Sequence, residues 1–198
     1  MCPAGFTVIL LLFVILGLAA GLIAGGRIER LGQVHLTWAP LAIAGLLIQF
    51  VLFSDSVAEW LGQAGSLGPA LYLGSTALVL LALLRNLRQP GLAIIALGAV
   101  LNAVVILANS GAMPVSPDAL EILGRPVPDA AFTNVVLATE ATVLPWLGDV
   151  IPLPLPAPFG TAVSIGDLLI GAGAAVFLVR TMTARPPAVS PPAATLTP

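Results

Sequence analysis

Long stretches without any charged residue constrain this chain more than any other feature. Among 198 residues there are seven Arg, no Lys and nine Asp or Glu, so only 8% are charged. In an average soluble domain about a quarter of the residues are charged. So few charges cannot cover a water-exposed surface, which excludes a soluble globule, a nucleic-acid binder and a disordered polymer. The sequence therefore predicts an integral membrane protein with one compact domain.

The uncharged stretches have nearly the length needed to cross a bilayer. A hydrocarbon core of about 30 Å takes about 20 helical residues. We expect the first stretch to be a retained helix, because no basic segment precedes it as in a signal peptide. The predicted fold class is all-α: an integral membrane helical bundle of about five transmembrane helices, with a structured extracytoplasmic loop. The predicted helices cover residues 5–24, 35–53, 67–84, 91–108 and 164–179.

These helices form one predicted transmembrane domain, residues 1–185, whose outer loop covers residues 109–163. The tail, residues 186–198, contains five Pro and no charge, so we expect it to be disordered and cytoplasmic.

The arginines predict the orientation of the bundle. Six of the seven follow the first, third or fifth predicted helix, and therefore lie on one side: Arg27, Arg30, Arg85, Arg88, Arg180 and Arg185. Arginine is enriched on the cytoplasmic side of membranes. We therefore expect a cell-membrane protein with an extracytoplasmic N-terminus and a cytoplasmic C-terminus.

A rival topology has a sixth span at residues 130–147. That stretch contains Glu140 and Pro145, and a charge at the centre of a span costs about 2.5–3.5 kcal/mol on insertion scales. We favour five spans, with residues 130–147 as a short helix or re-entrant piece at the outer surface.

The outer loop has its own local signals. Ser116 is predicted to cap a short helix that starts at Pro117 and stops at Gly124. Asp129 is similarly predicted to cap a helix over Ala130–Leu137. The alternating prolines of residues 151–158 predict an extended run without ladder hydrogen bonds.

Small and amide side chains predict how the helices pack. Gly17, Gly21 and Gly25 give the first helix a smooth face, and small residues let helix backbones approach closely in lipid. The amides of Asn102 and Gln49 are expected to bond neighbouring helices.

Three carboxylates are the candidate catalytic residues: Asp167, Asp149 and Glu140. Asp167 lies in the first turn of the last helix, where Ser164 and Asp167 together predict a capping box. The alternative is that Asp167 has a raised pKa and acts with Asp149 or Glu140 as an acid/base pair. The spacing allows such a meeting without requiring it.

Asn109, Gly111 and Pro114 follow the fourth helix and are interpreted as its stop, since Asn and Gly tolerate the left-handed conformation. No cofactor or metal site is predicted: the chain has one Cys, one His and no Lys to complete a phosphate-binding loop.

Four elements together resemble an uncharacterised bacterial membrane protein family, a domain of unknown function. They are Asn109 to Val115, Thr139 to Thr142, Leu147 to Asp149, and Ser164 to Asp167, the last including Gly166. The resemblance implies a bundle of about five spans and no particular activity. Ser110 departs from it where a second Gly is expected.

A weaker resemblance links Asp167 and the acidic, apolar segment around Asp149 to lipoprotein signal peptidase, a membrane aspartic protease. It implies two active aspartates at the outer face. Helix four offers Asn102 but no acid where that family has its other aspartate, so Asp149 or Glu140 would have to replace it.

Three functions follow as hypotheses. The first is a non-enzymatic accessory or scaffold subunit whose outer loop contacts another membrane protein. The second is a membrane-embedded hydrolase that uses Asp167 with Asp149 or Glu140. The third is a binder or transporter of a small apolar molecule. The expected partners are the lipid bilayer and possible membrane protein subunits, and no nucleic acid.

Overall fold

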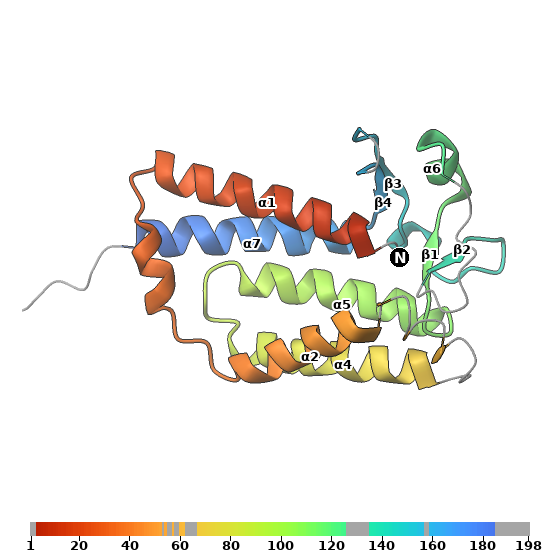
Figure 1. Ribbon diagram of the computed structural model, residues 1–198, viewed down its shortest axis with the longest axis horizontal. Helices are drawn as coiled ribbons and strands as arrows, with labels where there is room; N and C mark the ends of the chain where they lie inside the picture. Colours follow the sequence, from red (N-terminus) through yellow and green to blue (C-terminus); the bar gives the residue numbers. More distant parts are fainter. Residues whose placement is uncertain are drawn as a thin grey trace, which may run out of the picture.

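Five helices dominate the computed structural model, which describes residues 3–52, 54, 57, 60–61, 67–125, 135–156 and 159–184. They run lengthwise in an elongated bundle (Figure 1), so the predicted helical bundle is confirmed at this level. The helices are α1 (Pro3–Ile23), α2 (Ala39–Leu52), α4 (Leu67–Arg85), α5 (Leu92–Ala108) and α7 (Ile165–Thr183).

The second helix begins later than predicted. The chain first forms the 3-10 helix η1 (Ile28–Gln33), and Trp38 then has a φ of 62°, which an α-helix does not accommodate. With 14 residues, α2 is about 21 Å long.

Helix α7 lies between α1 and α5, and small residues form both contacts (Figure 1). A Cβ on Gly17 of α1 would come within 2.8 Å of the Ala175 backbone, and one on Gly21 would reach the Met182 side chain. The predicted smooth face of α1 is therefore confirmed at these two glycines. Gly25 is different: it lies in the turn after α1 with a φ of 74°, and a Cβ there would meet no atom within 4 Å.

Helices α2 and α4 form a second pair. A Cβ on Gly45 would lie 2.7 Å from the Ser75 carbonyl oxygen, and the Gln49 amide donates a hydrogen bond of 3.1 Å to the Thr76 hydroxyl. The predicted bond between Gln49 and a neighbouring helix is thus confirmed. The pair joins the α1–α7–α5 group through the contact of α4 with α5.

The prediction of an all-α fold is wrong in the outer loop, which contains four short strands. Strand β1 (Met113–Val115) pairs in parallel with β2 (Val135–Leu137), and β3 (Ile151–Leu153) pairs antiparallel with β4 (Thr161–Val163). The helix predicted over residues 130–137 is wrong at β2, where β-branched valines favour a strand. Its other residues and Asp129 lie outside the described part of the chain.

The extended proline run also departs from its prediction, because Ile151–Leu153 forms ladder bonds. Pro152 lies opposite Ala162 in this two-stranded sheet, and each strand of such a sheet is an edge, where a missing N–H is tolerated.

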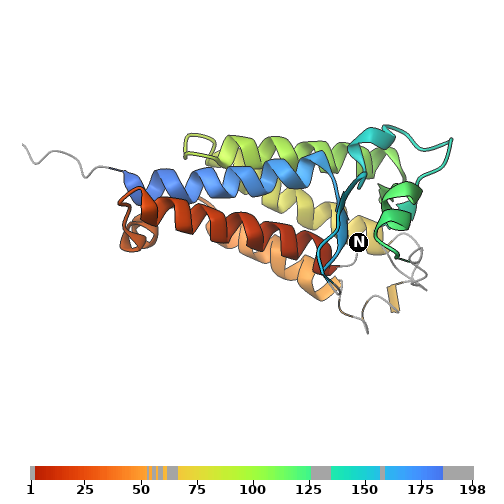
Figure 2. The same ribbon diagram turned by 90° about the horizontal axis from the view of Figure 1, so that it is seen from above.

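Other local predictions for the loop are confirmed. Helix α6 (Pro117–Ile122) has Pro117 at its start, and the Ser116 hydroxyl accepts a hydrogen bond from the Ala119 N–H at 3.4 Å. Gly124 follows with a φ of 60°. The strands, α6 and the 3-10 helix η2 (Pro145–Leu147) all gather at one end of the bundle (Figure 2).

Two described helices, α4 and α7, are long and apolar enough to cross a membrane, where the sequence predicted five. Residues Val8–Ile23, α2 and α5 are apolar but shorter. Apolar side chains are exposed along the outward helix faces, including Leu11, Ile15, Ile43, Leu47, Leu97, Val104 and Leu107.

Candidate functional site

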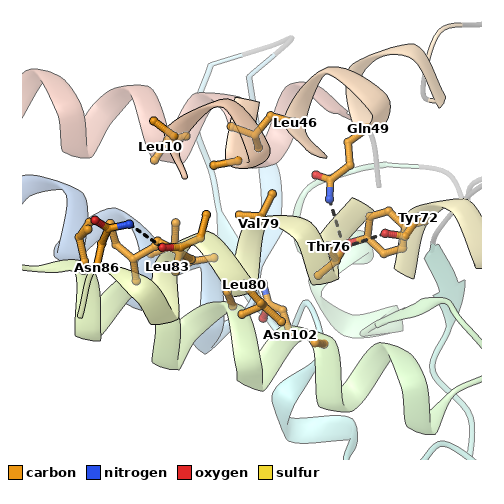
Figure 3. A pocket seen from close by; sticks show the side chains of 18 of the residues that line it. Leu10, Leu46, Gln49, Tyr72, Thr76, Val79, Leu80, Leu83, Asn86 and Asn102 are labelled. Carbon is orange, nitrogen blue, oxygen red and sulfur yellow. Dashed lines mark hydrogen bonds between the residues drawn. The ribbon is translucent and has the colours of Figure 1, made fainter. Parts of the chain in front are cut away.

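A cavity of about 630 Å³ lies between the α2–α4 pair and the α1–α7–α5 group (Figure 3). Its walls are mostly apolar, with Leu10 of α1 and Leu46 of α2 on one side and Leu80 and Leu83 of α4 on the other. Along α5 its lining extends from Leu92 to Ile106, about 21 Å at the helical rise. The cavity is therefore elongated parallel to the helices.

Asn102 and Asp167 both line this cavity and form, with Ser164, a polar group that we call the Asn102–Asp167 cluster. The Asn102 amide donates to Asp167 Oδ1 at 2.8 Å, and the Ser164 hydroxyl donates to Asn102 Oδ1 at 2.9 Å. The predicted bond of Asn102 to a neighbouring helix is confirmed.

The predicted capping box at the start of α7 is confirmed as well. The Asp167 N–H donates to Ser164 Oγ at 3.0 Å, and the Ser164 N–H donates to Asp167 Oδ2 at 3.1 Å. Ser164 and Asp167 are both buried. The structural and functional interpretations of Asp167 are thus compatible, because the capping carboxylate also faces the cavity.

Gly166 makes this arrangement possible. A Cβ there would collide with Asn102 Oδ1 and lie 2.8 Å from the Gly98 carbonyl oxygen. Gly98 is equally constrained, since its Cβ would collide with the Gly166 carbonyl oxygen. The two glycines let α5 and α7 approach closely enough for the amide of Asn102 to reach Asp167.

Asp149 is the second buried carboxyl at this end. Its backbone forms a parallel bridge to Val115: its N–H donates to the Pro114 carbonyl at 2.8 Å, and its carbonyl accepts from Ser116 N–H at 3.1 Å. Its side-chain Oδ1 is buried without a hydrogen-bond partner among the described residues.

Burial raises the pKa of Asp149 well above its usual range, and repulsion from the Asp167 carboxylate raises it further. A buried carboxylate without a partner is costly, so the neutral form is favoured. Asp149 and Asp167 are therefore near enough for the charge of Asp167 to influence the pKa of Asp149. Glu140, by contrast, is exposed in a turn, so the third candidate carboxylate does not share their environment.

The residues after α5 support the loop beside this site. The Asn109 amide donates to the Val105 and Val143 carbonyls, both at 2.8 Å, and its Oδ1 accepts from Val143 N–H. Asn109 caps α5 as predicted, but without the left-handed conformation, which Ser110 and Gly111 adopt with φ of 59° and 90°.

Pro114 is buried in β1, and a Cβ on Gly148 would collide with its carbonyl oxygen. Met113 and Leu147 pack with Val105 and Ile106 in one buried cluster. The family-like segments Asn109–Val115 and Leu147–Asp149 therefore hold each other in place.

A polar pair that the sequence reasoning missed lies at the other end of the cavity. The Asn86 amide donates to the Thr37 and Ala82 carbonyls at 2.6 and 2.7 Å, and its oxygen accepts from Thr37 N–H at 2.9 Å. Asn86 lies between Arg85 and Arg88. In this charged segment the sequence does not distinguish a buried amide from a solvated one. Within the described residues, no group of three or more His, Cys, Asp and Glu side chains could hold a metal ion.

Comparison with known proteins gives a family without an assigned activity. The family described as "Family of unknown function (DUF5317)" matches residues 33–179, which is 147 of the 198 residues. A protein of Thermotoga maritima, described as uncharacterized, is 35% identical over 94 residues. That alignment covers 48% of this chain and 54% of the relative, so the chain spans about half the relative's length. No solved structure matches.

Proposed function

We propose that this chain, which belongs to the DUF5317 family, is a multi-pass membrane protein that binds one elongated amphiphile in the cavity between its helices. The observation that carries the proposal is the cavity of about 630 Å³, whose lining is mostly apolar with a few polar side chains, among them the Asn102–Asp167 cluster. Ligand sites in proteins commonly measure about 300–1,000 Å³ and combine apolar walls with a few polar groups.

The membrane part of the proposal has five spans, with the N-terminus outside and the C-terminus in the cytoplasm. It is supported by the exposed apolar faces of the helices, since large apolar patches are rare on soluble monomers. The grouping of Arg27, Arg30, Arg85, Arg88 and Arg180 at the bundle end where α1, α4 and α7 finish also supports it (Figure 1).

The loosest wall of the cavity supports entry from the bilayer. Helix α1 packs against α7 and α2 packs against α4, whereas α1 and α2 have no comparable contact with each other. Both nevertheless contribute to the lining, through Leu10 and Leu46. An amphiphile whose hydrocarbon chain is already in the bilayer would enter between α1 and α2.

Filling the cavity tests the proposal. Ala99 lines the cavity on α5, whereas Ala93 on the same helix is exposed and does not line it. Native mass spectrometry of the protein titrated with 1-hexadecanol should show one bound molecule. Ala99→Phe should abolish it, and Ala93→Phe should retain it. Equal binding by both variants would show that the molecule occupies the outer surface instead.

A second candidate function is the membrane-embedded hydrolase, favoured by the burial of two carboxyls, Asp149 and Asp167, whose charges influence each other. One would act as acid and the other as base. The test is hydrolysis of a quenched fluorescent apolar peptide by the reconstituted protein. Activity should vanish in Asp149→Asn and Asp167→Asn and persist in Glu140→Gln; absence of turnover by the natural protein contradicts this candidate.

The accessory or scaffold role stays a prediction. The surface that it would use is the strand-bearing end of the molecule, where Val143, Trp146 and Phe159 are exposed. Co-purification of a membrane protein that is lost on Trp146→Ser would support it.

A further inference from the structure

We infer that the cavity selects an amphiphile whose head group is a hydroxyl or an ammonium, and rejects one whose head group is a carboxylate or phosphate. This inference rests on the proposed function and concerns the chemistry at one end of the same cavity. The geometry that carries it is the Asn102–Asp167 cluster, which lies towards one end of a mostly apolar channel and supplies the one carboxylate among its described lining residues.

The choice of end follows from the hydrogen bonds already made at each. At the Asn86 end, the amide uses its oxygen and its nitrogen on the Thr37 and Ala82 backbone. At the opposite end, each Asp167 oxygen accepts one bond, from Asn102 or from Ser164. A carboxylate offers about four acceptor positions, so Asp167 can still accept from a donor in the cavity.

Charge then decides which donor fits. Asp167 lines the cavity, and none of the described lining residues is Arg, Lys or His. An anionic head group would therefore face a carboxylate with no cation to compensate it, and like charges at short range in a poorly polar environment repel strongly. A hydroxyl or an ammonium donates to the carboxylate oxygens, and charge-assisted hydrogen bonds are the stronger kind.

Asp149 also disfavours an anionic head group. Its Oδ1 is buried with no partner among the described residues, and the charge of Asp167 raises the pKa of this carboxyl. Asp149 does not line the cavity, so a negative charge on it would act on a head group only through its field, in the same direction as a charge on Asp167.

The apolar part of the ligand contributes little to selectivity. A hydrocarbon chain in the bilayer is already out of water, so moving it into an apolar cavity gains mainly packing contacts. The polar contacts of the head group therefore decide between amphiphiles of equal chain length.

The experiment compares three 16-carbon probes on the natural protein: 1-hexadecanol, hexadecylamine and hexadecanoate. Each is titrated separately at pH 7, and occupancy is followed by native mass spectrometry. We expect half-saturation by the alcohol and the amine at a concentration at least tenfold below that for the carboxylate.

Two variants attribute the selection to Asp167. Asp167→Asn keeps a side chain that can accept from Ser164 and should reduce the preference to less than about threefold. Asp118→Asn makes the same charge change at an exposed position of α6 and should leave it unchanged. Asp167→Glu retains the charge and should retain the preference, which provides a test if Asp167→Asn does not fold.

The outcomes separate the two proposals. Equal binding of all three probes, or tightest binding of hexadecanoate, overturns the head-group inference and leaves the amphiphile site standing. Binding of none of them overturns the proposed function itself. A preference that survives Asp167→Asn overturns the assignment to Asp167.

Discussion

The two ends of the cavity contain the same residue type, asparagine, in opposite circumstances. The Asn86 amide forms hydrogen bonds with backbone groups of Thr37 and Ala82, which link the segment before α2 to the end of α4. Asn102 bonds two side chains, Ser164 and Asp167, and lies beside a second buried carboxyl. At the first end both amide hydrogens of Asn86 are used on the backbone, whereas the second end presents a carboxylate that can still accept from a ligand. Burial of a polar side chain is therefore not a sign of function until its partners are known.

The largest expected effect comes from the glycine that lets the Asn102 end form. Gly166→Ala would drive a Cβ into Asn102 and the Gly98 backbone, and overpacking of this kind costs about 3 kcal/mol. We expect a marked fall in Tm together with loss of hexadecanol binding. Gly74→Ala is the control: nothing lies within 4 Å of its added Cβ, so stability should stay equal or rise. Equal Tm values for the two variants would contradict the close α5–α7 approach.

The second largest effect is expected at the Asn86 end of the cavity. Asn86→Ala removes the hydrogen bonds of the buried Asn86 amide to the Thr37 N–H and carbonyl, and an intramolecular hydrogen bond contributes about 1 kcal/mol to stability. We expect thermal unfolding to show this loss while the preference between hexadecanol and hexadecanoate stays unchanged. A changed preference would mean that the Asn86 end also takes part in recognition.

The buried acid near the Asn102 end should make stability depend on pH. Because the pKa of Asp149 is raised in the folded state, its contribution is most favourable below the unfolded value of about 3.9. It then declines by up to about 1.4 kcal/mol per pH unit until the folded pKa is reached. Asp149→Asn should remove this decline, so the variant should be more stable than the natural protein at pH 7. Unfolding curves from pH 4 to pH 8 measure how the free energy of unfolding depends on pH. The same pH dependence in Asp149→Asn and in the natural protein would refute the prediction.

The smallest effect is expected for Glu140, a candidate carboxylate that does not line the cavity. Glu140 is exposed, and exposed substitutions usually change stability by less than about 0.5 kcal/mol. Glu140→Gln should match the natural protein in Tm and in probe selectivity. A clear loss of Tm or of probe selectivity in Glu140→Gln would show that Glu140 contributes to the site.

The helices and their caps could be predicted because their causes are local. Ser164 and Asp167 are three residues apart, and Ser116 directly precedes Pro117, so capping follows from spacing. The strands could not, since β1 pairs with a segment about 20 residues away and β3 depends on β4. The β3–β4 ladder was not predicted, because alternating prolines disfavour ladder bonds and nothing local in β3 indicates β4 as its partner.

The site was predicted in part. Asp149 and Asp167 stand out in the sequence because apolar residues surround them, and the structure buries both. The cavity had no sequence signal, since its lining comes from five helices whose relative positions depend on glycine contacts such as Gly98 with Gly166. Asn102 was expected to bond a neighbouring helix, but only the fold identifies Asp167 as its partner.

The central claim is that an amphiphile lies inside the bundle, and photolabelling of the natural protein in phosphatidylcholine nanodiscs tests it most directly. The probe is 1-hexadecanol with a diazirine in its chain, and labelled residues are identified by mass spectrometry. The account predicts saturable labelling of cavity residues such as Ala99, Ala103 and Leu83. Labelling confined to the outward residues Leu97, Val100 and Val104 of α5 would contradict it.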